Sequence, residues 1–150
     1  MITKAFWLVL AVALAGATAW LFASALPNNS PNTAVGSATA TPGAALVELK
    51  LPAMLSAQAA TGKTYYDAVC ASCHGANAAG QDGIAPPLVH KIYEPSHHGD
   101  AAFLVAVRNG ARQHHWSFGS MLPVQQKLTD GEIAAITLYV RELQRGNGIM

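Results

Sequence analysis

The chain has 150 residues, of which 51% are hydrophobic and 11% carry a formal charge. This length accommodates one ordinary domain with additional segments. Because basic and acidic side chains nearly balance, for a net charge of +1, the composition lacks the basic excess of a nucleic-acid-binding protein and argues against a nucleic-acid partner.

The N-terminal segment, residues 1–26, is predicted to be a signal-anchor helix or a signal peptide. Residues 5–26 form an uncharged apolar run directly after Lys4. At about 1.5 Å per residue, a helix of this length spans a hydrocarbon core of roughly 30 Å, which favours a membrane anchor. The alternative is cleavage, because the small residues at 17–19 and 23–25 resemble signal-peptide cleavage sites. In both cases the rest of the chain crosses the membrane, with the lysine favouring a cytoplasmic N-terminus.

Residues 27–60 are rich in Pro, Ala, Ser and Thr and are predicted to form a flexible linker. Such a composition cannot bury enough apolar surface to offset the entropy of ordering. A linker of this length has a root-mean-square reach of roughly 30–35 Å, which lets a tethered domain move between partners. Within it, residues 47–51 alternate apolar and polar side chains, as in a short strand that packs on the domain or on a partner.

The pattern becomes that of a helical domain at residues 61–147. Thr61 is a predicted N-cap of a first helix that runs to Cys70. Gly62, Tyr66 and Cys70 recur every four residues and therefore share one face. We expect this face to pack against another helix and to position the cysteine.

The only two cysteines belong to the pentapeptide Cys70-Ala71-Ser72-Cys73-His74. A CxxCH run is the attachment signature of a c-type haem, in which both sulfurs reach one porphyrin and the histidine reaches the iron. A structural zinc site would need a further ligand pair at a typical spacing, and a thioredoxin-like pair would need a βαβ context. The sequence therefore predicts one covalently attached haem c with His74 as an axial ligand.

A loop rich in glycine and proline follows, at residues 75–88. A ligating histidine needs an acceptor for its second ring nitrogen, which fixes the tautomer and the ring plane. The carbonyl of Pro86 is the candidate acceptor for His74. The alternative is that Pro86 and Pro87 only stiffen the loop.

A middle helix is predicted to begin at Gly99 and Asp100, with Asp100 as its N-cap and Gly110 as its stop. Phe103, Leu104 and Val107 would form its apolar side.

Met121 is the predicted sixth ligand of the haem iron, a position that a thioether or an imidazole usually fills. It lies in an irregular segment after the middle helix. The other methionines are less suitable, because Met1 falls in the anchor, Met54 in the linker and Met150 at the C-terminal end.

Two histidine pairs, His97-His98 and His114-His115, offer alternatives. An imidazole from the second pair in place of the methionine would lower the reduction potential of the haem. The pairs are also a candidate site for copper or another metal ion. Without a carboxylate or cysteine in a recognisable ligand spacing, they are predicted to be surface histidines.

The last helix has the clearest start signal, a capping box from Thr129 to Glu132. Arg141 and Arg145 are expected near its end, with Gly146 beyond them. This helix should pack across the first one through four apolar side chains that share a face: Ile133, Ile136, Val140 and Leu143.

Taken in order, these features resemble a small bacterial class I cytochrome c domain over residues 61–145. The resemblance implies an all-α fold, with three to four main helices around one covalently bound haem. It also implies that Gly62 and Tyr66 of the first helix pack against Ile136 and Tyr139 of the last.

In that family a proline carbonyl twelve residues after the ligating histidine accepts a hydrogen bond from its ring, and this position is Pro86. The following haem-packing leucine corresponds to Leu88 and the axial methionine to Met121. Two positions depart from the family pattern, because Leu122 separates the methionine from a proline and Ala85 replaces a glycine. By the same resemblance, two side chains are candidate hydrogen-bond donors to the haem propionates: Arg112 and Trp116.

These features predict a one-electron carrier without substrate chemistry of its own, docking through a local patch around an exposed haem edge. Its redox partners would be a donor dehydrogenase or quinol-oxidising complex and an acceptor oxidase or reductase. The alternatives are a haem subunit of a larger oxidoreductase and a sensor or peroxidase-like protein with an open sixth site. The expected location is the periplasmic side of the bacterial inner membrane, anchored by residues 5–26, or the soluble periplasm after cleavage.

Overall fold

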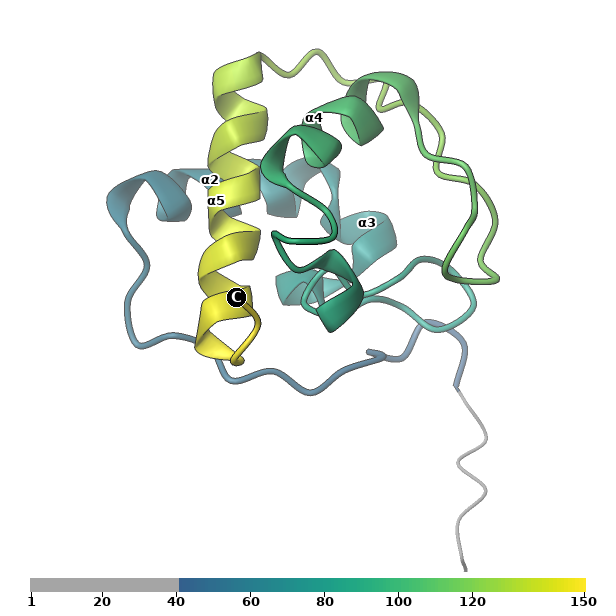
Figure 1. Cartoon of the computed structure of the whole chain (residues 1–150), viewed down its shortest axis with the longest axis horizontal. Coiled ribbons are helices and arrows are strands. Elements are labelled where there is room, and N and C mark those ends of the chain that lie inside the picture. The colour runs from purple at the N-terminus through teal and green to yellow at the C-terminus, as the bar shows by residue number, and fades with distance from the viewer. Residues whose placement is uncertain (1–40) are drawn as a thin grey trace, which may run out of the picture. The chain divides into compact units, whose positions relative to one another are not determined.

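Two long helices, α2 (Ala57–Val69) and α5 (Asp130–Gly146), pack together at the centre of the domain (Figure 1). The structure is a computed structural model that describes residues 41–150. Within this range the remaining helices are short, and the only β-type pairings are isolated bridges. The described residues thus confirm the all-α prediction. The shorter elements are α3 (Ala71–His74), α4 (Asp100–Asn109) and two 3₁₀ helices, η1 (Ala76–Ala78) and η2 (Lys91–Tyr93).

The first helix begins earlier than predicted, because Ser56 and not Thr61 is its N-cap. The Ser56 hydroxyl accepts a hydrogen bond from the N–H of Ala59 at 3.2 Å. The same hydroxyl donates to the carboxylate of Glu142 at 2.6 Å, so the cap is also attached to α5. The hydroxyl of Thr61 instead donates to the carbonyl of Ala57 inside the helix.

The chain before α2 contacts the domain, although the sequence predicts this stretch as the end of a flexible linker. The N–H of Leu46 donates to the carbonyl of Ala79 at 3.1 Å. The N–H of Lys50 donates to the side-chain oxygen of Asn147, whose amide donates back to the Lys50 carbonyl. These partners belong to a loop and a side chain, so the strand predicted at residues 47–51 does not form. Backbone groups contribute to this attachment beside the side chains of Leu49 and Leu55, which pack against the core. The residue composition does not reveal the backbone contacts.

The crossing of α2 and α5 depends on a residue without a side chain. A Cβ atom at Gly62 would lie 1.9 Å from the carbonyl oxygen of Ala135, so the two backbones touch there. One turn along, the rings of Tyr66 and Tyr139 pack with centroids 5.4 Å apart. The Tyr66 hydroxyl donates to the carbonyl of Gly75 at 2.9 Å. The predicted packing of the first helix on the last is therefore confirmed.

The predicted start and apolar face of α5 are both confirmed. The Thr129 hydroxyl accepts from the N–H of Glu132 at 3.2 Å, and the Glu132 carboxylate accepts from the N–H of Thr129 at 2.6 Å. The four predicted core side chains on this helix are all buried: Ile133, Ile136, Val140 and Leu143.

Helix α4 ends at Gly110 as predicted, but Asp100 is not its cap. Gly99 occupies the N-cap position, and no side chain caps the helix. The Asp100 carboxylate instead accepts a hydrogen bond from Nε of Arg141 on α5, at 2.8 Å. Gly110 has a φ of 75° and therefore adopts the left-handed conformation that often terminates a helix.

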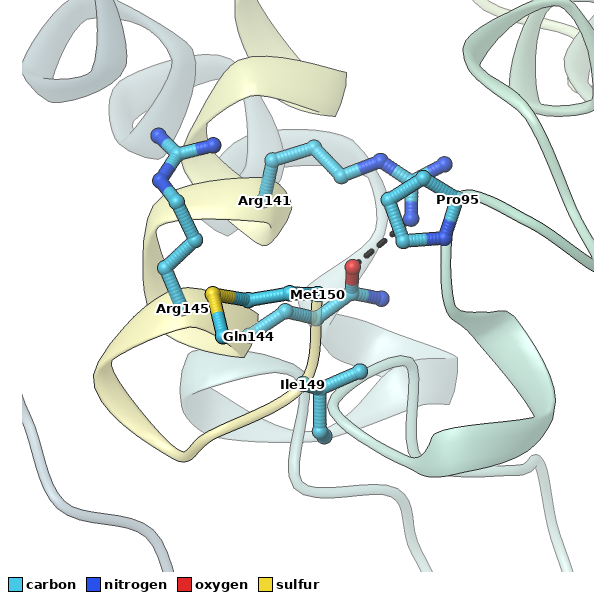
Figure 2. A pocket seen from close by; sticks show the side chains of 6 residues that line it. All are labelled: Pro95, Arg141, Gln144, Arg145, Ile149 and Met150. Carbon is cyan, nitrogen blue, oxygen red and sulfur yellow. Dashed lines mark hydrogen bonds between the residues drawn. The ribbon is translucent and has the colours of Figure 1, made fainter.

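Arg141 was expected near the C-terminal end of the last helix but is buried inside the domain, with 4% of its surface exposed. Its guanidinium donates to the carbonyls of Tyr93 and His98. It also donates to the side chain of Gln144 at 2.7 Å, an interaction drawn in Figure 2. The Gln144 amide donates to the carbonyls of Leu88 and Tyr93. These two side chains attach the segment between the glycine-rich loop and α4 to helix α5.

No helix among residues 41–150 is long and apolar enough to cross a bilayer. The predicted anchor at residues 5–26 lies outside the described residues, as does the part of the predicted linker before residue 41.

Replacing Gly62 by Ala should destabilise the domain, because the added methyl group would overlap the backbone of α5. We expect the free energy of unfolding to fall by about 3 kcal/mol, measured by denaturant unfolding of the haem-loaded protein. Gly131→Ala is the matched control, since a Cβ there meets only the Thr129 hydroxyl at 4.0 Å. Equal stability of the two variants would contradict the close helix contact.

Candidate functional site

The cysteines and the histidine of the CxxCH run lie on the helical turn that follows α2. The N–H of His74 and the N–H of Cys73 both donate to the carbonyl of Cys70, at 2.9 and 3.1 Å. Cys70 is half-buried and Cys73 exposed, and both thiols are free. Burial raises the pKa of Cys70 to about 11, with the neighbouring Cys73 contributing further, so the thiol is protonated at neutral pH.

His74 is oriented by the loop that follows it. Its Nδ1 lies 2.9 Å from the carbonyl oxygen of Pro86. A carbonyl oxygen can only accept, so Nδ1 carries the proton and Nε2 keeps its lone pair. Burial lowers the pKa of His74, and the Pro86 contact opposes this only in part. The ring is therefore held in the neutral tautomer that can bind a metal ion through Nε2.

The loop between His74 and Pro86 is closed by backbone contacts that need glycine. The N–H of Gly80 donates to the carbonyl of His74 at 2.8 Å. Gly80 has a φ of 76°, and a Cβ there would lie 2.5 Å from the backbone nitrogen of Pro87. A larger residue at this position would push the proline pair away from the histidine.

Gln81 is a residue of the site that sequence reasoning missed. Its side-chain amide lies within 3.3 Å of three carbonyl oxygens at the end of α3, those of Ala71, Ser72 and Cys73. It therefore stabilises the short helix that carries the haem-attachment residues. A glutamine in a polar loop has no distinctive spacing, so the sequence holds no signal for this role.

Leu88 is half-buried and packs against the core. Its N–H donates to the carbonyl of Ala78 at 2.9 Å, and its own carbonyl accepts from the Gln144 amide at 2.8 Å. The backbone at this position is thus held from both sides.

Met121 lies at the end of a loop whose two ends are paired. Its N–H and carbonyl exchange hydrogen bonds with Ala111 at 2.9 and 3.0 Å, in an antiparallel bridge. The Met121 side chain is half-buried, whereas Leu122 is 79% exposed. The bridge fixes where the backbone of Met121 lies, and its role as an iron ligand stays a prediction.

Trp116 carries a polar atom without a partner. Among residues 41–150, its indole nitrogen is the only buried side-chain nitrogen or oxygen that makes no hydrogen bond. Burial raises the pKa of Tyr93, and the nearby indole N–H lowers it to a smaller extent, although the two groups do not meet hydrogen-bond geometry. A buried donor without an acceptor costs free energy, and a haem propionate would supply the acceptor. The unpartnered N–H of Trp116 therefore fits the predicted cofactor.

The two histidine pairs, far apart in the sequence, meet in the structure. The Nε2 atoms of His97 and His115 lie 3.2 Å apart, and those of His98 and His114 lie 3.4 Å apart. Three of the four rings are exposed and His98 is half-buried, which agrees with the prediction of surface histidines. Their convergence into one cluster was not predicted.

Comparison with known proteins places residues 59–144 within the family model for cytochrome c. The chain is similar to the cbb3-type cytochrome c oxidase subunit CcoP of Azospirillum brasilense, with 36% identity over 96 residues. It is also similar to CcoP of Azospirillum sp. (strain B510), with 39% identity over 93 residues. These matches cover 61% and 58% of the chain but only 30% and 29% of the two relatives.

Replacing Trp116 by Phe would remove the unpartnered N–H while keeping an aromatic ring. If this N–H donates to a propionate, its loss leaves the carboxylate more negative and stabilises Fe(III). We expect the reduction potential to fall by some tens of millivolts, measured by potentiometric titration. Tyr65→Phe, which removes the hydroxyl of a half-buried tyrosine on α2, should leave the potential unchanged. An unchanged or higher potential in the Trp116 variant would contradict this role.

Proposed function

Because the chain belongs to the cytochrome c family and carries covalently bound haem c, we propose that it is a one-electron carrier with His74 and Met121 as axial ligands. The observation that carries the proposal is the helical CxxCH turn in which Nδ1 of His74 donates to the Pro86 carbonyl. This contact leaves Nε2 free on a ring that cannot easily rotate. A ligand held in one orientation favours electron transfer, since little reorganisation is needed between oxidation states.

The haem supplies the reversible exchange of one electron between Fe(III) and Fe(II). The residues of this chain hold and insulate it. Cys70 and Cys73 would form the thioether bonds, and the Leu88 side chain would pack against the porphyrin. The apolar core around α2 and α5 limits solvent access and provides a low dielectric, which helps to set the reduction potential of the haem.

The proposal of Met121 as the sixth ligand is supported by the bridge with Ala111, which keeps its backbone in one place. A thioether ligand raises the potential relative to a second imidazole. Next to it, the exposed side chain of Leu122 offers an apolar contact for a redox partner. With a net charge of only +1, docking would rely on such local contacts.

A second candidate function is that of a fixed haem subunit in a larger oxidase. It is favoured by the similarity to two proteins named as subunits of cbb3-type cytochrome c oxidase. The chain spans about 30% of the length of these relatives. Its membership of such an oxidase is therefore a proposal. In both candidates residues 5–26 anchor the protein, residues 27–40 tether it, and the domain lies on the periplasmic side of the bacterial inner membrane. Cleavage after the apolar segment would instead yield a soluble periplasmic carrier.

Affinity capture from solubilised native membranes separates a free carrier from a fixed subunit. A subunit should co-purify with haem-containing oxidase chains in a constant ratio, whereas a free carrier should be recovered alone. The intact mass of the captured chain, measured by mass spectrometry, reports whether residues 1–26 are retained.

Replacing Met121 by Ala should open the sixth position of the iron. We expect the native reduced protein to be low-spin and not to bind carbon monoxide, and the variant to bind it, as measured by difference absorption spectroscopy. Met54→Ala is the matched control, because Met54 is 86% exposed and lies before α2.

Two outcomes would contradict the ligand assignment. Carbon monoxide binding by the native protein would indicate an open sixth site and favour a sensor or a peroxidase-like protein. A Met121 variant that stays low-spin and unreactive would indicate that another side chain, such as His114 or His115, binds the iron.

A further inference from the structure

Four imidazole rings from two segments form a cluster on one side of the domain. His97 and His98 lie between η2 and α4, and His114 and His115 lie in the loop between Ala111 and Met121. The ring centroids of neighbouring members are 4.2 to 5.7 Å apart. Electron transfer by the haem does not require this cluster.

The hydrogen bonds of two rings determine which nitrogen faces the centre of the cluster. Nδ1 of His98 lies 2.7 Å from the carbonyl oxygen of Ile92, and Nδ1 of His114 lies 2.6 Å from that of Arg112. Because a carbonyl oxygen only accepts, both Nδ1 atoms carry protons. In the neutral rings both Nε2 atoms therefore present lone pairs, and these atoms are 3.4 Å apart. Two lone pairs facing each other repel unless a proton or a metal ion lies between them.

Two of the nitrogen–nitrogen distances in the cluster match those of a tetrahedral site. With metal–nitrogen bonds of about 2.0–2.1 Å, a tetrahedral ion holds its ligand nitrogens about 3.3 Å apart. The observed distances between Nε2 atoms are 3.2 Å for His97 and His115 and 3.4 Å for His98 and His114. Ligand nitrogens of His97, His98 and His115 all lie within 4.8 Å of one another. His114, whose Nε2 lies 3.4 Å from that of His98, is the candidate fourth ligand.

The backbone that carries the cluster is held in place on both sides. The carbonyl of His98 accepts from the buried guanidinium of Arg141, which also binds the Tyr93 carbonyl. On the other side, the loop is closed by the bridge at Met121 and by a hydrogen bond from the N–H of Gln113 to the Ser120 hydroxyl at 3.1 Å. Ligands on fixed backbones need little ordering when an ion binds.

The carbonyl contacts of His98 and His114 are also those expected of metal-binding histidines, whose second nitrogen usually donates to a carbonyl or carboxylate. Desolvation lowers the pKa of His115, and the electrostatic effect of His114, His97 and His98 lowers it further. The neutral ring, which is the form that binds metal ions, is therefore favoured near neutral pH.

We propose that His97, His98, His114 and His115 form a binding site for one divalent transition-metal ion, with Zn²⁺ as the ion that the nitrogen spacing fits. Imidazole ligands suit Zn²⁺ and Cu²⁺, and the near-tetrahedral spacing favours Zn²⁺ over the tetragonal coordination of Cu²⁺. The ion would connect the segment before α4 to the loop that ends at Met121. The site does not depend on the proposed redox role, because none of its ligands is assigned to the haem.

The experiment is a calorimetric titration of the full-length, haem-loaded protein with Zn²⁺, in detergent, without a polyhistidine tag and after removal of metals by a chelator. We expect one Zn²⁺ per chain. The double variant His98→Gln/His114→Gln should bind about a hundredfold more weakly or worse. The control is His90→Gln, since His90 lies outside the cluster, and its affinity should match that of the native protein.

Thermal unfolding is a second test of Zn²⁺ binding that does not depend on the calorimetric heats. Zn²⁺ should raise the thermal midpoint of the native protein and of the His90 variant but not that of the double variant. The haem absorption spectrum of each variant checks that the domain is folded. The proposal fails if the native protein binds Zn²⁺ no more tightly than the double variant, or if only Cu²⁺ binds. The carbon monoxide test of Met121→Ala shows separately whether the iron takes His114 or His115 from this site.

Discussion

The structure depends on one constraint, the contact between the backbones of α2 and α5 at Gly62. Because no side chain separates the helices there, Tyr66 reaches both the ring of Tyr139 and the carbonyl of Gly75. The residue whose carbonyl accepts this hydrogen bond directly follows His74. The helix crossing therefore sets the position of the haem-attachment turn, and the chemistry of the site rests on a packing contact some distance from it.

The parts of the fold encoded by neighbouring residues were predictable from the sequence. The CxxCH turn and the capping box of α5 depend on short spacings, whereas the acceptor at Pro86 followed from the family resemblance. The start of α2 was not predictable in the same way, because Ser56 and Thr61 are both good capping residues. Ser56 is favoured because its N–H and hydroxyl both donate to the carboxylate of Glu142, which is 86 positions away in the sequence.

Long-range contacts also explain what the sequence did not reveal in the second half of the chain. Arg141 has the sequence position of a surface residue near a helix end, but its guanidinium finds carbonyl acceptors in the segment before α4 and becomes buried. The histidine pairs beginning at His97 and His114 each resemble an ordinary surface loop. Only the tertiary fold brings them together, on the same loop system that carries Met121.

The claim that the chain is a one-electron carrier with a closed iron site is tested most directly by a potentiometric titration of the full-length native protein. Resonance Raman spectra recorded along the titration report the coordination and spin state of the iron. We expect a single one-electron transition between two six-coordinate, low-spin forms. A five-coordinate or high-spin reduced form would contradict the claim, because the iron would then have an open position for a substrate or a gas.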